Sequence, residues 1–171
     1  GMTQDGYREH SKQGSEKAVA NAGVRISKDL ASRFFFAAVR SRSQLPGYVT
    51  RAQLLSDPSL AQGRWPEGFQ RRDVDSLRVA NKTVLTQGDY RFELAAYALQ
   101  QQLWHPITYG FIEQDTNTFG ATLKLSTDAR VQGLPNNLGI AYLPDTGSTR
   151  GSSRAVAAGF AQGVLNSDYT Q

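Results

Sequence analysis

The chain has 171 residues, of which 19 are lysine or arginine and 15 are aspartate or glutamate, giving a formal net charge of +4. It contains no cysteine, which excludes disulfides, thiolate metal sites and cysteine nucleophiles. It has no run of 18 apolar residues, so no transmembrane helix and no membrane partner are expected.

The N-terminal part is predicted to hold a polar tail and one long helix. Residues 1–14 are mostly polar and predict a disordered tail. The helix is expected over residues 15–42, because its apolar positions fall at three- and four-residue spacings or multiples of them. These positions are Val19, Ile26, Leu30, Phe34 and Ala37.

The middle of the chain predicts an irregular stretch, a strand and a second helix. Residues 43–75 carry proline and glycine throughout and are expected to be irregular, apart from one short helical turn over 50–55. A strand is expected over 76–86. A helix is then expected from Asp89 to about Trp104, with an apolar stripe made by Phe92, Ala96, Leu99 and Leu103.

Three strands and a last helix are predicted for the remainder. The strands are expected over 107–113, 119–125 and 138–143, with a turn at 115–118 between the first two. The stretch G-S-T-R-G-S-S-R-A-V-A-A-G-F-A-Q-G-V-L, residues 147–165, predicts a polar loop followed by a helix from Ser152 to about Asn166. The loop and the helix N-terminus could hold a phosphate, or the small residues could serve only for close packing.

This order of elements predicts an α+β fold, with helices on one face of a three-stranded antiparallel sheet and an N-terminal helical extension. The chain divides accordingly into a tail (1–14), a helix with an irregular extension (15–88), a domain (89–166) and a short tail (167–171).

Several segments of residues 89–166 resemble the double-stranded-RNA-binding domain. E-L-A-A-Y-A-L-Q-Q (93–101) resembles the first helix of that family, and Y-G-F-I-E-Q (109–114) and F-G-A-T-L-K-L (119–125) resemble its first two strands. The final G-S-S-R-A-V-A-A-G-F-A-Q-G-V-L (151–165) resembles its last helix. The chain departs from the family pattern in three places: the turn at 115–118 has no histidine, the lysine cluster of the last helix is reduced to Arg154, and the connection over about 126–137 is longer than usual.

The resemblance implies a non-catalytic RNA-associated module that reads RNA shape and phosphates within a ribonucleoprotein or RNA-processing assembly. It implies weak binding of double-stranded or structured RNA, without a cofactor. The residues that it assigns to RNA contact are Glu93, Gln100, Gln101, Asn117, Thr118, Arg150, Ser152, Ser153 and Arg154. On this interpretation Gln100, Arg150 and Arg154 should share one exposed face.

Two other functions fit the same sequence. A protein-interaction or structural subunit without RNA binding would use residues 15–75 and expose an apolar patch near Phe35, Phe36 or Trp65. A small hydrolase would use His105 with Glu113 or Asp115 in a cleft. No histidine and carboxylate spacing indicates a metal site. The composition does not fix the compartment, and an intracellular location is expected rather than secretion.

Overall fold

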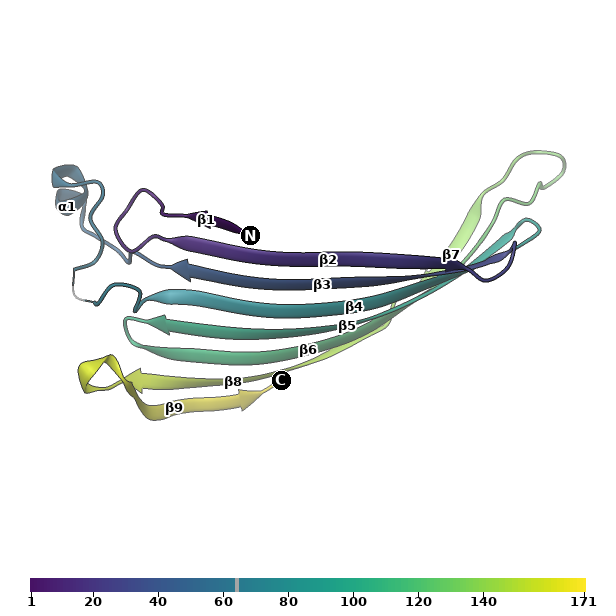
Figure 1. Cartoon of the computed structure of the whole chain (residues 1–171). Helices are drawn as coiled ribbons and strands as arrows, with labels where there is room; N and C mark the ends of the chain where they lie inside the picture. Colours follow the sequence, from purple (N-terminus) through teal and green to yellow (C-terminus); the bar gives the residue numbers. More distant parts are fainter. Residues whose placement is uncertain (64) are drawn as a thin grey trace.

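A single-layered antiparallel sheet makes up nearly the whole molecule in this computed structural model, which describes residues 1–63 and 65–171. Figure 1 shows long strands that run side by side and curve together, with α1 beyond one end of the sheet. The strands are β1 (Met2–Gln4), β2 (Gln13–Arg25), β3 (Leu30–Gln44), β4 (Arg71–Gln87), β5 (Tyr90–Ile107), β6 (Gly110–Thr127), β7 (Leu138–Tyr142), β8 (Asp145–Val156) and β9 (Gln162–Thr170). The helical elements are α1 (Arg51–Ser56) and the 3-10 turn η1 (Ala158–Phe160).

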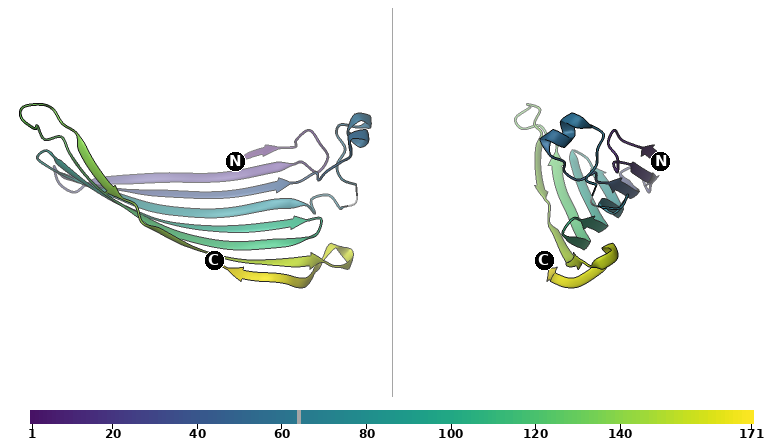
Figure 2. Two further views of the ribbon diagram at one scale, coloured as in Figure 1. Left: turned by 180° about the vertical axis from the view of Figure 1, so that it is seen from behind. Right: turned by 90° about the vertical axis from the view of Figure 1, so that its left-hand side faces the viewer.

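The strands follow one another across the sheet in chain order. The order is β1-β2-β3-β4-β5-β6-β8-β9, and β7 pairs with β6 beyond the end of β8. β7 and β8 therefore lie along the same edge of β6, separated at Pro144, whose carbonyl accepts a hydrogen bond from the Ala121 amide at 2.9 Å. The two termini lie near opposite edges of the sheet, as the views from both sides show (Figure 2).

Each end of the sheet carries short turns, and its longest connection is 128–137 between β6 and β7 at one end and 45–70 between β3 and β4 at the other. β2 to β3 and β4 to β5 are joined by short turns, and Gly88 in the second of these has a φ of +58°, which glycine adopts without strain. At the opposite end the 26-residue connection from 45 to 70 contains α1, whose first turn is capped by Thr50 and Gln53. This end, marked by α1 in Figure 1, is called the α1 end below, and the other is called the hairpin end.

The compact apolar packing lies at the α1 end. Among the described residues the buried apolar side chains are Ala61, Trp65 and Phe111. The Trp65 ring stacks on Phe69 with centroids 5.0 Å apart, and the cluster continues to Phe111, Trp104 and Phe160 through ring contacts of 5.3–5.6 Å. The rest of the sheet has no second layer, so its large apolar side chains stay uncovered.

The predicted α+β fold, with its three-stranded sheet, is wrong, and with it the resemblance to the double-stranded-RNA-binding domain. The expected helix over 15–42 is the hairpin of β2 and β3, with its turn closed by Ser27, whose hydroxyl accepts from the Leu30 amide at 3.1 Å. The expected helix from Asp89 to Trp104 is the strand β5. In β5, Phe92 and Ala96 fit a strand as well as a helix, because positions four apart share a face in both.

The C-terminal prediction is also corrected. The expected helix from Ser152 to Asn166 is the end of β8, the turn η1 and β9. Gly159 and Phe160 have φ values of +71° and +61°, so the chain reverses there instead of continuing as a helix. The expected turn at 115–118 lies inside β6, which joins the two strands predicted on either side of it.

The strands expected over 76–86 and 138–143 are present within β4 and as β7. The division into a tail, an extension and a domain stays a prediction. Residues 1–14 include β1 and the start of β2, and position 89 lies in the turn between β4 and β5.

Candidate functional site: an apolar band and a charged belt

The strand register assigns every side chain of the sheet to one of two faces. Residues directly opposite in an antiparallel pair point to the same side, and successive residues of one strand point to opposite sides. Phe36 pairs with Val79, Val79 with Ala98, and Ala98 with Phe119. The side that carries these four residues is called face A, and the opposite side is called face B.

Face A carries a continuous apolar band toward the hairpin end. On β4 the band runs over positions 77–85, and on β5 its last apolar residue toward the belt is Ala98. The residues that make it up are Ala18, Ala20, Ala22, Val24, Leu30, Phe34, Phe36, Ala38, Leu77, Val79, Leu85, Phe92, Leu94, Ala96, Ala98, Phe119, Ala121, Leu123, Leu125, Leu138, Ile140 and Tyr142.

The band is exposed across its width. Phe34 is 60% exposed, Phe119 57% and Leu94 50%. Isolated exposed apolar residues are ordinary on water-facing surfaces, whereas a contiguous patch across six strands marks a surface that contacts something apolar.

Three polar side chains interrupt the band and satisfy one another. Ser32 and Thr83 hydroxyls lie 2.9 Å apart, and the Asn81 amide nitrogen donates to the Ser32 hydroxyl at 2.9 Å. The Thr83 hydroxyl donates to the Asn81 amide oxygen at 3.0 Å. This polar trio (Ser32, Asn81 and Thr83) therefore lowers the cost of placing polar groups within an apolar surface.

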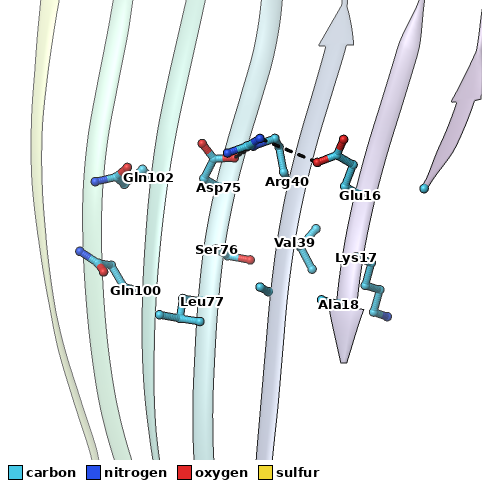
Figure 3. A pocket seen from close by; sticks show the side chains of 12 residues that line it. Glu16, Lys17, Ala18, Val39, Arg40, Asp75, Ser76, Leu77, Gln100 and Gln102 are labelled. Atoms are coloured by element: carbon cyan, nitrogen blue, oxygen red, sulfur yellow. Dashed lines mark ion pairs between the residues drawn. The ribbon is translucent and has the colours of Figure 1, made fainter. Parts of the chain in front are cut away.

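A charged belt borders the band on the side of the α1 end. Arg40 lies between Glu16 and Asp75 on neighbouring strands, with nitrogen–oxygen distances of 3.8 and 3.6 Å (Figure 3). One row further on, Arg42 donates to Asp75 at 2.7 Å and lies 3.8 Å from Asp73. The belt (Glu16, Arg40, Arg42, Asp73 and Asp75) therefore consists of two neighbouring rows of alternating charge across β2, β3 and β4.

The belt's hydrogen bonds shift the protonation of its members. The bond from Arg42 lowers the pKa of Asp75 below its ordinary value, with further lowering from the charges of Arg42 and Arg40. The same bond raises the pKa of Arg42. Both groups are therefore charged at neutral pH, and the apolar surface of face A ends at a fixed line of ions.

Face B differs from face A most clearly behind the apolar band. There it carries Arg25, Arg33, Lys82, Arg91 and Lys124 with one carboxylate, Glu93, together with apolar residues such as Phe35 and Val84. At the level of the belt it mixes polar residues such as Ser76 and Gln101 with apolar ones such as Val39 and Leu103. Face B is therefore charged behind the band and of mixed character beyond it.

Large and small side chains interlock across strands on face B. The Tyr97 ring lies over Gly120 and the Tyr169 ring over Gly151, so that a Cβ atom at either glycine would overlap the ring. An aromatic ring over a cross-strand glycine shields the exposed backbone and fixes the register.

The residues predicted to contact RNA lie on both faces. Face A carries Gln100, Asn117, Arg150, Ser152 and Arg154, and face B carries Glu93, Gln101, Thr118 and Ser153. The first set does place Gln100, Arg150 and Arg154 on one side, as the RNA interpretation requires, but Glu93 is engaged on the other side with Lys82 and Arg91, at 2.5 and 2.8 Å. RNA contact by these residues stays a prediction.

The hydrolase interpretation requires His105 to lie beside Glu113 or Asp115. His105 pairs with Ile112 and points to face B, whereas Glu113 and Asp115 point to face A. The His105 Nδ1 atom lies 2.7 Å from the Arg71 carbonyl oxygen. The structure does not bring these groups together.

Comparison with known proteins supports the fold but gives no family. No protein-family description matches the chain, and no curated protein matches it. Among solved structures, the ferric citrate transporter FecA in its unliganded form is similar over 96% of this chain, with a TM-score of 0.75 and 13% sequence identity. This chain spans about 25% of the length of that one, so the similarity concerns the sheet alone.

Sequence reasoning missed the apolar band because the band is a property of strand register. A usable signal was present in F-E-L-A-A-Y-A-L (92–99), where every second residue from Phe92 is small or apolar. In the described part of the chain no helix is both long enough and apolar enough to cross a membrane.

Proposed function

We propose that this chain forms part of the wall of a membrane-embedded β-barrel, with the apolar band of face A against lipid and face B toward water. The observation that carries the proposal is the band itself, exposed on one face across six strands and interrupted only by the polar trio. The earlier expectation of no membrane partner rested on the lack of a helical span, which does not bear on strands.

The height of the band suits a bilayer. A tilted membrane strand needs about 9–11 residues, and the band covers positions 77–85 on β4. Strands of membrane barrels alternate apolar residues that face the lipid with polar residues that face the interior. The chain shows this pattern, because face B is charged directly behind the band. The belt then lies at the border of the lipid, where the cost of charge falls.

The polar trio fits the same placement. A hydroxyl or amide group in hydrocarbon is costly when it has no hydrogen-bond partner, and Ser32, Asn81 and Thr83 supply partners to one another.

Lipid contact also requires that the edges of the sheet be paired. β1 pairs with β2 only at 13–15, so the outer edge of β2 is open over the height of the band, as is the outer edge of β7. Unpaired backbone groups are not tolerated in hydrocarbon, so we expect further antiparallel strands to add at both edges in the membrane.

A matched pair of substitutions tests the proposal. Val79 points into the band and its neighbour Ala80 points to face B. We expect Val79→Arg to abolish flotation with phosphatidylcholine vesicles, since arginine facing mid-bilayer lipid costs about 2–4 kcal/mol. Ala80→Arg should float like the unaltered protein. Equal flotation of both variants would contradict the proposal.

A protein-interaction subunit is the second candidate, and the exposure of Phe36 on face A, at 41%, favours it; the equally exposed Phe35 points to face B and lies outside the band. In that case a protein partner covers the band, and the unaltered chain does not float with vesicles. The vesicle experiment therefore separates the two candidates.

A further inference from the structure

We infer that a hollow on face B binds a small polyanion bearing carboxylate or phosphate groups. The hollow has a volume of about 430 Å³ and lies behind the apolar band. The residues that line it on face B include Gly23, Arg25, Ala31, Arg33, Lys82 and Val84. The inference rests on the proposed function, because the membrane placement is what makes face B the water-facing side.

The hollow contains two like charges on neighbouring strands. Arg33 and Lys82 lie directly opposite each other on β3 and β4. Like charges at such positions destabilise a sheet, because their Cβ atoms are about 4.5–5.5 Å apart. Arg25 adds a third cation two residues along β2 from Gly23, the partner of Arg33. An anion between the three would remove this repulsion.

Two of these cations have no counter-ion among the described residues. Among the described residues, no carboxylate lies within ion-pair distance of Arg25 or Arg33, and both side chains are exposed. Lys82 does contact Glu93, but Glu93 is shared with Arg91. The hollow therefore keeps an excess of positive charge.

Arg33 is also held in place by its neighbours on β2. Its guanidinium donates to the Asn21 side-chain oxygen and lies across Gly23, where a Cβ atom would come within 3.2 Å of the Arg33 Nε atom. A guanidinium fixed in this way keeps its remaining N–H groups available, and arginine binds carboxylate and phosphate through paired N–H donors. Rings of arginine and lysine serve the same purpose in anion-selective pores.

The size of the hollow selects the occupant. A volume of about 430 Å³ holds a compact molecule with two or three anionic groups and is too small for a folded acidic segment. We therefore assign the hollow to a small solute.

Calorimetric titration of the protein in phosphatidylcholine vesicles, which carry no net charge, tests the inference. The two probes are pyrophosphate and benzene-1,3,5-tricarboxylate, which separate phosphate from carboxylate as the preferred group. The unaltered protein should bind at least one of them, and Arg25→Gln with Arg33→Gln should weaken that binding at least tenfold. Gly23→Ala, which leaves the charge unchanged but displaces Arg33, should weaken it severalfold.

The control changes the same number of charges elsewhere on face B. Lys17→Gln with Arg72→Gln should leave binding unchanged, because these residues lie toward the α1 end. Equal weakening by both double variants would overturn the inference, since only the general charge of the face would then matter.

Two further results separate this inference from other readings. If the protein floats with vesicles but binds neither probe, the inference fails and the proposed function stands. If neither probe binds but a 20-base-pair RNA duplex does, and Arg25→Gln with Arg33→Gln abolishes that binding, the small-anion inference is overturned in favour of a nucleic-acid surface.

Discussion

At the scale of single residues, the two faces are distinguished by what each position tolerates. Tyr97 fills the space above Gly120, and we expect Ala80 to accept a long charged side chain where its neighbour Val79 does not. These contrasts arise because consecutive residues of a strand meet different surroundings.

Gly120→Ala should destabilise the sheet by about 1–3 kcal/mol, because the new methyl group overlaps the Tyr97 ring. Gly139→Ala is the matched control, since the nearest atom there would lie 3.6 Å from the new Cβ atom, which is ordinary contact. Urea midpoints in detergent measure both. The penalty should disappear in a Tyr97→Ala background, and its persistence there would refute the contact as its cause.

The ion pair between Arg42 and Asp75 should make the stability of the fold depend on pH in the acid range. The pKa of Asp75 is lowered in the folded protein, chiefly by the bond from Arg42, so this carboxylate stabilises the fold above its unfolded pKa and loses that contribution as the pH falls through its folded pKa. Both side chains are more than one-third exposed, which limits the effect to less than about 1 kcal/mol.

Arg42→Gln should therefore lower the free energy of unfolding at pH 6, and the difference from the unaltered protein should vanish as the pH falls through the lowered folded pKa of Asp75. Urea unfolding across this pH range measures the difference. A constant difference at every pH would show that the ion pair is not its source.

At the scale of elements, the sequence predicts β4 and β7 but not the period of the longest strands. Phe92 and Ala96 lie four apart, a spacing that places residues on one face of a helix and also on one face of a strand. Leu99 and Leu103 extend this spacing into a helical stripe and therefore favoured a helix. Leu94 and Ala98, however, complete the two-residue alternation of a strand. The site could not be predicted, because pairs such as Arg33 with Lys82 depend on a register that the sequence does not show.

The polar trio gives a prediction about β3 and β4 together. Asn81→Ala should destabilise the sheet in a bilayer by about 1–2 kcal/mol, because Ser32 and Thr83 each lose a partner. Replacing all three residues with alanine should cost less than the single change. The free energy of unfolding in vesicles measures both changes. A triple variant that is less stable than Asn81→Ala would contradict the placement of the trio against lipid.

At the scale of the whole molecule, the sheet has an uncovered apolar face and two open edges. Both features are unfavourable in water and are resolved together if the sheet lies in lipid and its edges gain strands. The β2–β3 and β4–β5 turns and the 128–137 connection then lie at the hairpin end beside the band, and the 45–70 connection with its aromatic cluster lies beyond the belt (Figure 1).

Amide exchange along β2 tests the closing of the edges. The backbone of residues 17–25 has no strand on its outer side in this structure, so half of its amides should exchange freely in the open sheet. We expect these amides to become protected on insertion into vesicles. Exchange that stays equally fast in the bilayer would mean that the edge is not paired there.

The most direct test of the account uses the absence of cysteine, since each introduced cysteine is then the sole labelling site. Single cysteines at positions 94 to 98 of β5, carrying spin labels in phosphatidylcholine vesicles, report contact with oxygen in lipid and with a nickel chelate in water. The account predicts that Leu94→Cys, Ala96→Cys and Ala98→Cys report lipid, while Ala95→Cys and Tyr97→Cys report water. Accessibility without a two-residue period would contradict the claim that face A meets the membrane.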